Sequence, residues 1–217
     1  MASIPVLRQM APQLGLTWQI VDFSERVSSA LLLAALSPLL CVSATALAVL
    51  SGRTPLIAHR RVGWRGSTLW MLKLRTMWDG ESSGCAGWIE YIDDEAGPQS
   101  KQEGDPRVAN SFARFCRRHS IDELPQLLHV IRGEMSWVGP RPLTAAELRR
   151  HYGSAAREVL EARPGIAGLW QTSGRNRLNY SERRELDLRF VRNRSLRLYW
   201  KILLRTIPEV WSGENSW

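Results

Sequence analysis

Two adjacent carboxylates, Asp122 and Glu123, stand at the start of a predicted helix. Apolar residues follow them at the spacing of one helical face: Leu124, Leu127, Leu128 and Ile131. Gly133 ends this pattern, and Pro125 is tolerated only in a first turn, so the helix should begin near Asp122. Both carboxylates would then lie where unpaired N–H groups and the helix dipole favour negative charge.

A simpler explanation of these carboxylates is helix capping. Ser120 to Glu123 fits a capping box, and Asp122 could itself be the N-cap. The surroundings favour chemistry, because several arginines lie close in sequence: Arg114, Arg117, Arg118 and Arg141. Carboxylates at a helix start, together with guanidinium groups, suit a phosphate ester and its metal ion.

Composition also indicates a phosphorylated partner. The chain has 217 residues, a formal charge of +8 and a pI near 10.1, and its only lysines are Lys73, Lys101 and Lys201. An arginine excess suits nucleic acid, anionic lipid or a phosphorylated substrate. The ten tryptophans fit membrane interfaces as well as cores. Three widely spaced cysteines suggest neither a disulfide framework nor a zinc site.

A membrane segment is predicted between Val27 and Gly52, where no residue is charged. As a helix this run is about 39 Å long, more than the roughly 30 Å hydrocarbon core of a bilayer. A secretory signal is the alternative, because Ala46-Leu-Ala48 resembles a cleavage site. The long preceding region, with Asp22 and Glu25, argues against it.

Ser37 and Pro38 break this segment near its middle. Pro38 removes the hydrogen bond to the carbonyl of Ala34, and Ser37 could satisfy the freed carbonyl. A kinked spanning helix and a re-entrant helix fit the break equally well. The cationic residues after Gly52 place that end in the cytoplasm.

The remaining elements are predicted by periodicity. Residues 54–78 fit a β-hairpin around Gly63 and Gly66, in which Lys73 and Arg75 share a face and could reach one anion. Residues 79–105 are predicted to be a loop or flap, with Asp93, Asp94 and Glu95 as surface charge. We expect helices at 106–119 and 144–161, a glycine-punctuated loop at 165–176, and a basic amphipathic tail at 180–207.

These features permit one reaction in particular. A carboxylate can attack phosphorus and form an acyl phosphate, which divides one displacement into two. An oxygen-bound Mg²⁺ would neutralise a diphosphate, and arginines would stabilise charge on the transferred group.

An ordered series of motifs resembles the bacterial sugar transferases, the monotopic phosphoglycosyl transferases that start lipid-linked glycan assembly. The motifs are Ser37-Pro38, Lys73-Leu-Arg-Thr-Met77, Asp105-Pro-Arg107, Ser120-Ile-Asp-Glu-Leu-Pro-Gln126, Arg132-Gly-Glu-Met-Ser136, Val138-Gly-Pro-Arg-Pro142, Arg163-Pro-Gly165 and Gly168-Leu-Trp-Gln-Thr-Ser-Gly-Arg-Asn176. The resemblance runs from about Arg26 to Ile207. Leu74 stands where the family often has Phe, and residues 79–105 match no family pattern.

The resemblance implies transfer of a sugar 1-phosphate from a UDP-sugar to undecaprenyl phosphate, with release of UMP. Asp122 would be the nucleophile that forms an aspartyl-phosphosugar intermediate, and Glu123 would share Mg²⁺ binding and proton handling with it. The implied substrate-binding residues are Lys73, Arg75, Arg117, Arg141, Arg175 and Asp187. The resemblance also makes the helix broken at Ser37-Pro38 re-entrant, with both of its ends in the cytoplasm.

The predicted fold is mainly α with a small β-hairpin. It comprises an N-terminal cytoplasmic or interfacial segment (1–26), a re-entrant membrane helix (27–52) and a compact cytoplasmic α/β catalytic domain (53–217) with interfacial amphipathic helices. The expected location is the bacterial inner membrane, without a nucleic-acid partner. The sequence leaves open the sugar, the polymer and the oligomeric state, a homodimer included. The alternative function is a non-catalytic, membrane-anchored binder of nucleic acid or anionic lipid.

Overall fold

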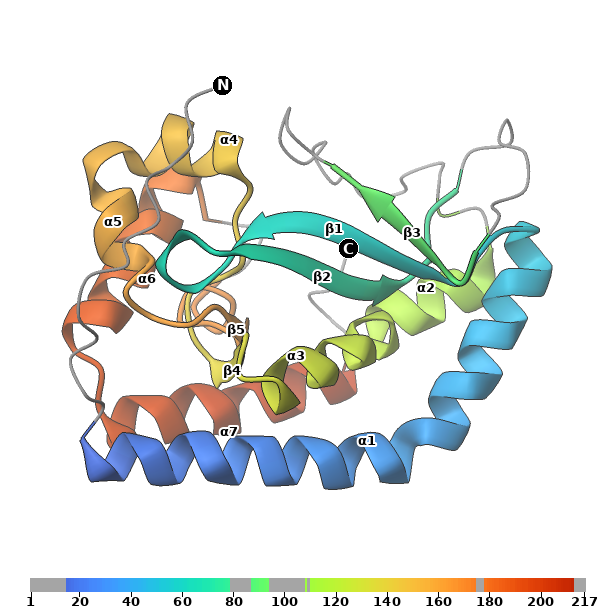
Figure 1. Ribbon diagram of the computed structural model, residues 1–217, viewed down its shortest axis with the longest axis horizontal. Coiled ribbons are helices and arrows are strands. Elements are labelled where there is room, and N and C mark those ends of the chain that lie inside the picture. Colours follow the sequence, from blue (N-terminus) through green and yellow to red (C-terminus); the bar gives the residue numbers. More distant parts are fainter. Residues whose placement is uncertain (1–14, 79–86, 94–107, 109, 175–177, 213–217) are drawn as a thin grey trace.

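A long helix and a small sheet frame the segment that contains Asp122 and Glu123. In the computed structural model, residues 15–78, 87–93, 108, 110–174 and 178–212 are described. Helix α1 (Leu16–Ser51) runs along one edge of the molecule and then turns toward the sheet (Figure 1). It begins well before Val27, so the predicted boundary between residues 26 and 27 does not interrupt the helix.

Pro38 lies inside α1, and Ser37 behaves as predicted from the sequence. The Ser37 hydroxyl donates to the carbonyl of Ala34 at 2.8 Å, which satisfies the acceptor that Pro38 cannot reach. Gly52 ends the helix in the left-handed conformation, with φ of 66°. By length and composition, α1 is the one helix in the described part of the chain that could cross a membrane.

The predicted hairpin is confirmed. Strands β1 (Leu56–Val62) and β2 (Thr68–Leu74) pair antiparallel, and Val62 lies opposite Thr68 across the turn. The turn holds the short 3-10 helix η1 (Trp64–Gly66). Ala58, Leu69, Met71 and Leu74 are buried, so the sheet contributes to the core.

The expectation that residues 79–105 are entirely loop is wrong. Ile89–Ile92 form strand β3, which pairs parallel with β1 and gives the strand order β2-β1-β3. Asp93, predicted to be surface charge, is half-exposed and pairs with Arg60 at 2.6 Å. The four-residue strand lies between segments rich in Gly, Ser and acidic residues, so its short apolar alternation does not stand out. Asp94 and Glu95 lie outside the described residues.

Helices α2 (Ser111–Arg118), η2 (Ile121–Gln126) and α3 (Leu127–Ile131) follow, and they lie beside α1 and the sheet (Figure 1). The predicted helix start near Asp122 is confirmed, but residues 121–126 form the 3-10 helix η2 and the α-helix α3 begins only at Leu127. Pro125 lies inside η2, where its missing N–H interrupts the α-helical hydrogen-bond ladder. Gly133 turns the chain after α3 with φ of 72°, in agreement with the prediction.

The helix predicted over 144–161 is divided into short pieces. These are α4 (Ala145–Glu147), the π-helix η3 (Leu148–Tyr152), the 3-10 helix η4 (Gly153–Ala155) and α5 (Ala156–Val159). Gly153, with φ of 52°, breaks the continuous helix. The predicted loop at 165–176 contains strand β5 (Gly165–Ala167), which pairs parallel with β4 (Ser136–Val138).

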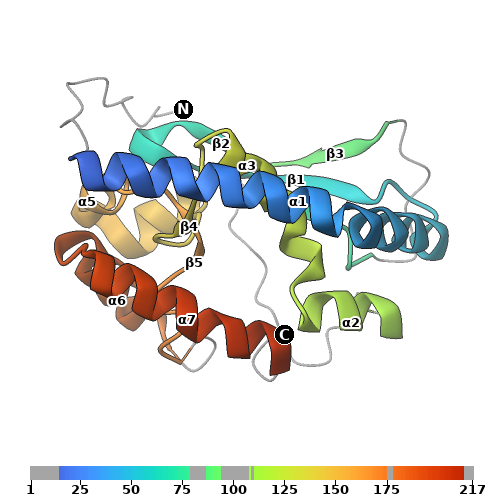
Figure 2. The ribbon, with the colours of Figure 1, turned by 90° about the horizontal axis from the view of Figure 1, so that it is seen from below.

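The predicted amphipathic tail forms two helices, α6 (Tyr180–Arg192) and α7 (Leu196–Ser212). Helices α1 and α7 lie across the same face of the molecule (Figure 2). Each exposes an apolar stripe, consisting of Leu16, Ile20, Phe23, Val27 and Leu31 on α1 and Leu196, Trp200, Leu204 and Ile207 on α7. Both stripes have helical spacing, so this face of the domain is apolar over two neighbouring helices.

Candidate active site

Asp122 and Glu123 occupy the first turn of η2, directly after a strained residue. Ser120 has φ of 55°, a left-handed conformation that is uncommon outside glycine, and its side chain makes no capping hydrogen bond. The capping-box explanation of these carboxylates is therefore wrong. Asp122 is 7 % exposed, and Glu123 is less buried.

A lysine from the sheet meets the second carboxylate. The ammonium group of Lys73 on β2 lies 2.6 Å from Oε1 of Glu123, and both side chains are largely shielded from solvent. The two residues are 50 positions apart in sequence, so their meeting depends on packing of β2 against η2. This pair thus involves the residue that follows Asp122 in the first turn of η2.

Arg75 is buried next to the end of β2, but it has different partners from Lys73. Its Nε donates to the carbonyl of Thr54 at 2.8 Å, and its guanidinium pairs with Glu90 on β3. Lys73 and Arg75 thus have different protein partners, and their sharing of one anion stays a prediction. β2 ends at Leu74, so the alternation of side chains does not extend to Arg75.

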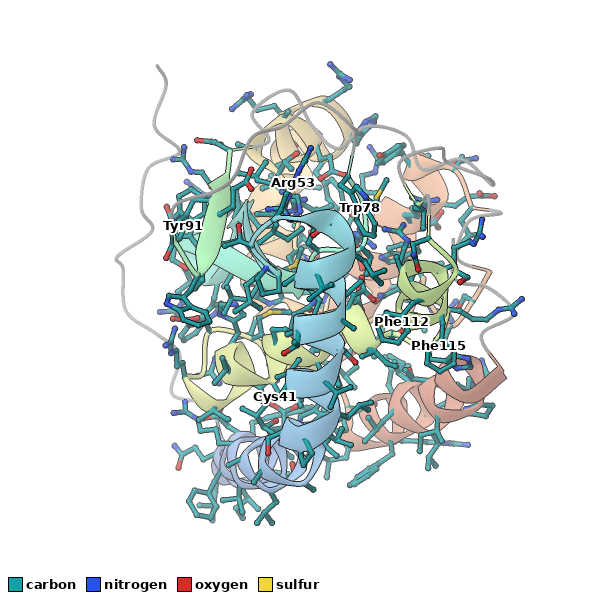
Figure 3. The ribbon with its side chains drawn as sticks, turned by 90° about the vertical axis from the view of Figure 1, so that its right-hand side faces the viewer. Cys41, Arg53, Trp78, Tyr91, Phe112 and Phe115 are labelled. Atoms are coloured by element: carbon teal, nitrogen blue, oxygen red, sulfur yellow. The ribbon has the colours of Figure 1, made fainter. Side chains whose placement is uncertain are left out.

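Helix α2 brings further cations to the same region. Its last turn contains Arg117 and Arg118, and the guanidinium of Arg117 lies 3.5 Å from the hydroxyl of Thr76. Cys116 on the same helix is buried, and burial, together with the negative charge of Asp122, raises the pKa of its thiol to about 11. Ala113 and Cys116 of α2 pack with Ile121 of η2 in one hydrophobic cluster, which holds the two helices together. Figure 3 shows the last part of α1 between β3, with Tyr91, and α2, with Phe112 and Phe115.

Arg141 and Asp187 belong to a second cluster. The guanidinium of Arg141 lies 5.7 Å from the ring centre of buried Trp170, and that of Arg183 lies 4.7 Å from the same ring. Asp187 is 1 % exposed and accepts a hydrogen bond of 2.7 Å from Tyr152. Burial raises the pKa of Asp187 to about 7, although Tyr152 and Arg141 oppose this effect.

The structure thus brings Asp122, Glu123, Lys73 and Arg117 to the η2 region, with Arg75 on the neighbouring strand end. Arg141 and Asp187 lie around Trp170 and Tyr152, and Arg175 lies outside the described residues. A substrate contact by Asp187 stays a prediction, because its recorded partner is Tyr152. Sequence reasoning missed Tyr152 and Glu90, since neither falls in a recognisable motif. Each is identified by its contact with a buried ionisable side chain: Tyr152 contacts Asp187, and Glu90 contacts Arg75.

The carboxylates fit one mode of Mg²⁺ binding. Among the described residues, no group of three or more His, Cys, Asp or Glu side chains could hold a metal ion. Mg²⁺ is commonly bound by one or two carboxylates together with substrate phosphates and water. Asp122 and Glu123 can supply those two carboxylates, so this donor set suits a metal that arrives with a diphosphate.

Buried Asp122 and the neighbouring Lys73–Glu123 ion pair, in a chain whose helix α1 could cross a membrane by length and composition, are compatible with a site that binds an anionic substrate at a membrane. Comparison with known proteins identifies the class more closely. A sequence model described as bacterial sugar transferase matches residues 17–213, so the chain belongs to the bacterial sugar transferase family. It is a transferase, which excludes the alternative of a non-catalytic binder.

Three relatives illustrate the similarity. The chain is 40 % identical over 195 residues to exopolysaccharide production protein ExoY of Sinorhizobium fredii, covering 86 % of this chain and 83 % of the relative. It is 40 % identical over 184 residues to the ExoY protein of Rhizobium meliloti, covering 83 % and 80 %. It is 36 % identical over 211 residues to UDP-glucose:undecaprenyl-phosphate glucose-1-phosphate transferase of Caulobacter vibrioides, covering 91 % and 73 %.

Proposed function

We propose that the protein transfers a sugar 1-phosphate from a UDP-sugar to undecaprenyl phosphate, the first step of exopolysaccharide assembly. Two lines of argument support this proposal. The Caulobacter relative is named for this kind of reaction, and the two rhizobial relatives are named for exopolysaccharide production. The buried carboxylate Asp122, next to the Lys73–Glu123 ion pair, supplies a suitable nucleophile.

The proposed reaction has two displacements. An oxygen of the Asp122 carboxylate attacks the sugar-bearing phosphorus of the donor, and the bond from that phosphorus to the UMP oxygen breaks. UMP leaves with the bonding electron pair, and Asp122 carries the sugar phosphate as an acyl phosphate. A phosphate oxygen of the lipid then attacks the same phosphorus, which releases polyprenyl diphosphate sugar and restores the carboxylate.

The neighbouring side chains have distinct proposed roles. Glu123 is held by Lys73, which fixes its carboxylate beside Asp122. Arg117 and Arg75 stabilise negative charge on the donor phosphates, and Arg141 and Arg175 bind the nucleotide or sugar phosphate. Mg²⁺, bound through Asp122 and Glu123, would neutralise the diphosphate of the donor.

We propose that α1 enters the membrane and returns on the same side. Near the start of α1, Glu25 accepts hydrogen bonds from Ser136 and Tyr199 of the domain. Just after its end, the carbonyl of Thr54 accepts from Arg75. A helix held at both ends by one domain cannot place those ends on opposite faces of a bilayer. The apolar stripes of α1 and α7 would then face lipid, and the catalytic domain would lie on the cytoplasmic side of the inner membrane.

The single observation that carries the catalytic proposal is the burial of Asp122 beside the Lys73–Glu123 pair. The purified protein should be incubated with Mg²⁺ and UDP-sugars labelled in the sugar, then denatured. We expect label to remain on the wild-type protein and to be absent from Asp122→Asn. Asp93→Asn is the matched control, because it neutralises a half-exposed aspartate in an ion pair at the end of β3. Full turnover by Asp122→Asn would refute the proposed nucleophile.

A further inference from the structure

A buried histidine joins the helix that follows the carboxylates to the strand that contains Lys73. His129 lies on α3 and is 3 % exposed. Its Nε2 lies 3.1 Å from the backbone nitrogen of Leu72 on β2. Among the described strands, β2 is at the edge of its sheet, so an N–H that points away from β1 has no strand partner. The imidazole supplies the acceptor that this buried edge requires.

The hydrogen bonds determine the tautomer of His129. The backbone N–H of Leu72 can only donate, so Nε2 is the acceptor and carries no proton. The proton is therefore on Nδ1, which lies 2.5 Å from Oε2 of Glu134. Glu134 is brought back to the histidine by the turn at Gly133, and its own backbone N–H donates to the carbonyl of His129 at 2.9 Å.

This contact lies next to the charged pair of the candidate site. Leu72 immediately precedes Lys73, whose ammonium group lies 2.6 Å from Glu123. Glu123 and His129 lie on one continuous helical segment, η2 followed by α3. Two links thus join the same strand to the same segment: a backbone hydrogen bond at His129 and an ion pair at Glu123. The hydrogen bond at His129 fixes the distance between β2 and the η2–α3 segment at which the Lys73–Glu123 ion pair can form.

We propose that His129 is a positioning residue that acts through the Lys73–Glu123 pair, with Glu134 holding it in the required tautomer. The inference rests on the proposed function, because it assigns the consequence of this spacing to the transfer step. His129 itself contacts neither substrate nor metal. Its hydrogen bond to Leu72 keeps the ammonium of Lys73 at Glu123, and thereby keeps the Glu123 carboxylate in place beside Asp122.

The experiment is a double-mutant cycle with a matched conservative variant. His129→Leu removes the acceptor at similar size, whereas the Oε1 of His129→Gln can still accept from the N–H of Leu72. Each is combined with Lys73→Met, and UMP release is measured under saturating UDP-sugar together with the KM and the thermal midpoint. We expect His129→Leu to lower kcat about tenfold and His129→Gln to restore most of the loss. In the Lys73→Met background, His129→Leu should change kcat by less than about twofold, because the Lys73–Glu123 ion pair through which His129 acts is already absent.

Independent effects of His129→Leu and Lys73→Met on kcat would overturn the proposal. If His129→Leu lowers kcat by the same factor with and without Lys73→Met, the histidine contributes to the fold but does not act through the pair. Equal losses in His129→Leu and His129→Gln, at equal thermal midpoints, would also refute a role for the acceptor. Failure of the proposed function is recognised separately, because the wild-type protein would then neither retain labelled sugar nor release UMP from any UDP-sugar.

Discussion

The hydroxyl of Tyr199 on α7 donates a hydrogen bond of 2.7 Å to Oε1 of Glu25 on α1, although the two residues are 174 positions apart. Glu25 is 4 % exposed, and the same carboxylate accepts from the hydroxyl of Ser136 at 2.7 Å and the backbone N–H of Trp137 at 3.2 Å. A buried carboxylate of α1 thus satisfies donors from β4 and α7. It attaches the N-terminal part of α1 to β4 and α7.

Replacing Glu25 should destabilise the protein, and the loss should be larger when more buried hydrogen-bond donors lose their acceptor. We expect Glu25→Leu to lower the free energy of unfolding by about 3–5 kcal/mol, because several buried donors lose their partner at once. Glu25→Gln keeps one carbonyl oxygen and should cost about 1–2 kcal/mol, and Tyr199→Phe should cost about 1 kcal/mol. Denaturant unfolding in detergent measures these differences. A Glu25→Leu protein as stable as the wild type would show that the carboxylate does not hold α1 to the domain.

The proposed re-entrant course of α1 requires its two ends to lie on the same side of the membrane. In a variant without native cysteines, Gln19→Cys should resist an impermeant maleimide in intact cells and react after the membrane is opened. Pro38→Leu restores a backbone donor to the middle of the helix and should favour a straight, spanning helix. Combined with Glu25→Leu, it should make a fraction of position 19 accessible from outside. External labelling of Gln19→Cys in the otherwise unaltered helix would contradict the re-entrant course.

Short-range patterns predicted the elements with strong local signals. The β1–β2 hairpin follows from alternation around Gly63 and Gly66, and the end of α3 follows from Gly133. Elements that depend on distant partners were missed or misplaced. β3 is only four residues long and exists because β1 pairs with it, and the short helices between Leu148 and Ala155 depend on packing that no periodicity reveals.

The site shows the same division. The order of the motifs and the position at a predicted helix start identified Asp122 and Glu123. The pairing of Glu123 with Lys73 was not predicted, since the ion pair depends on how β2 packs against η2. Alternation placed Lys73 and Arg75 on one face, whereas the strand ends between them and Arg75 turns to Glu90. Tyr152 was not predicted as a partner of Asp187, because α6 and η3 meet only in the folded chain.

Two motif glycines are required by a close backbone approach, which gives a prediction about packing. A Cβ at Gly165 would lie 2.0 Å from the backbone nitrogen of Gly139, and a Cβ at Gly139 would lie 2.3 Å from the carbonyl oxygen of Arg163. Gly165→Ala should therefore separate β4 from β5 and lower the free energy of unfolding by about 2–3 kcal/mol. Gly15→Ala is the control, because no atom lies within 4 Å of the added Cβ, and it should cost less than about 1 kcal/mol. Equal thermal midpoints for the two variants would show that β4 and β5 tolerate separation.

The buried carboxyl of Asp187 should make stability fall as pH rises. Its pKa is raised from 3.8 to about 7, chiefly by burial, and its Oδ1 has no hydrogen-bond partner. Between these two values the folded protein retains a proton that the unfolded chain has released. The free energy of unfolding therefore decreases with rising pH across this window, by up to about 1.4 kcal/mol per pH unit for one proton.

Asp187→Asn removes this titration while its carbonyl oxygen can still accept from Tyr152. We expect Asp187→Asn to gain stability relative to the wild type between pH 5 and pH 8, as measured by denaturant unfolding at each pH. Glu158→Gln is the control, because Arg192 lowers the pKa of Glu158, so this carboxylate stays ionised from pH 5 to pH 8 and the stability difference from the wild type should not vary with pH. A stability difference between Asp187→Asn and the wild type that stays constant with pH would mean that Asp187 is ionised throughout. The buried carboxylate would then be held by the positive charge of Arg141, and burial would not be the dominant influence.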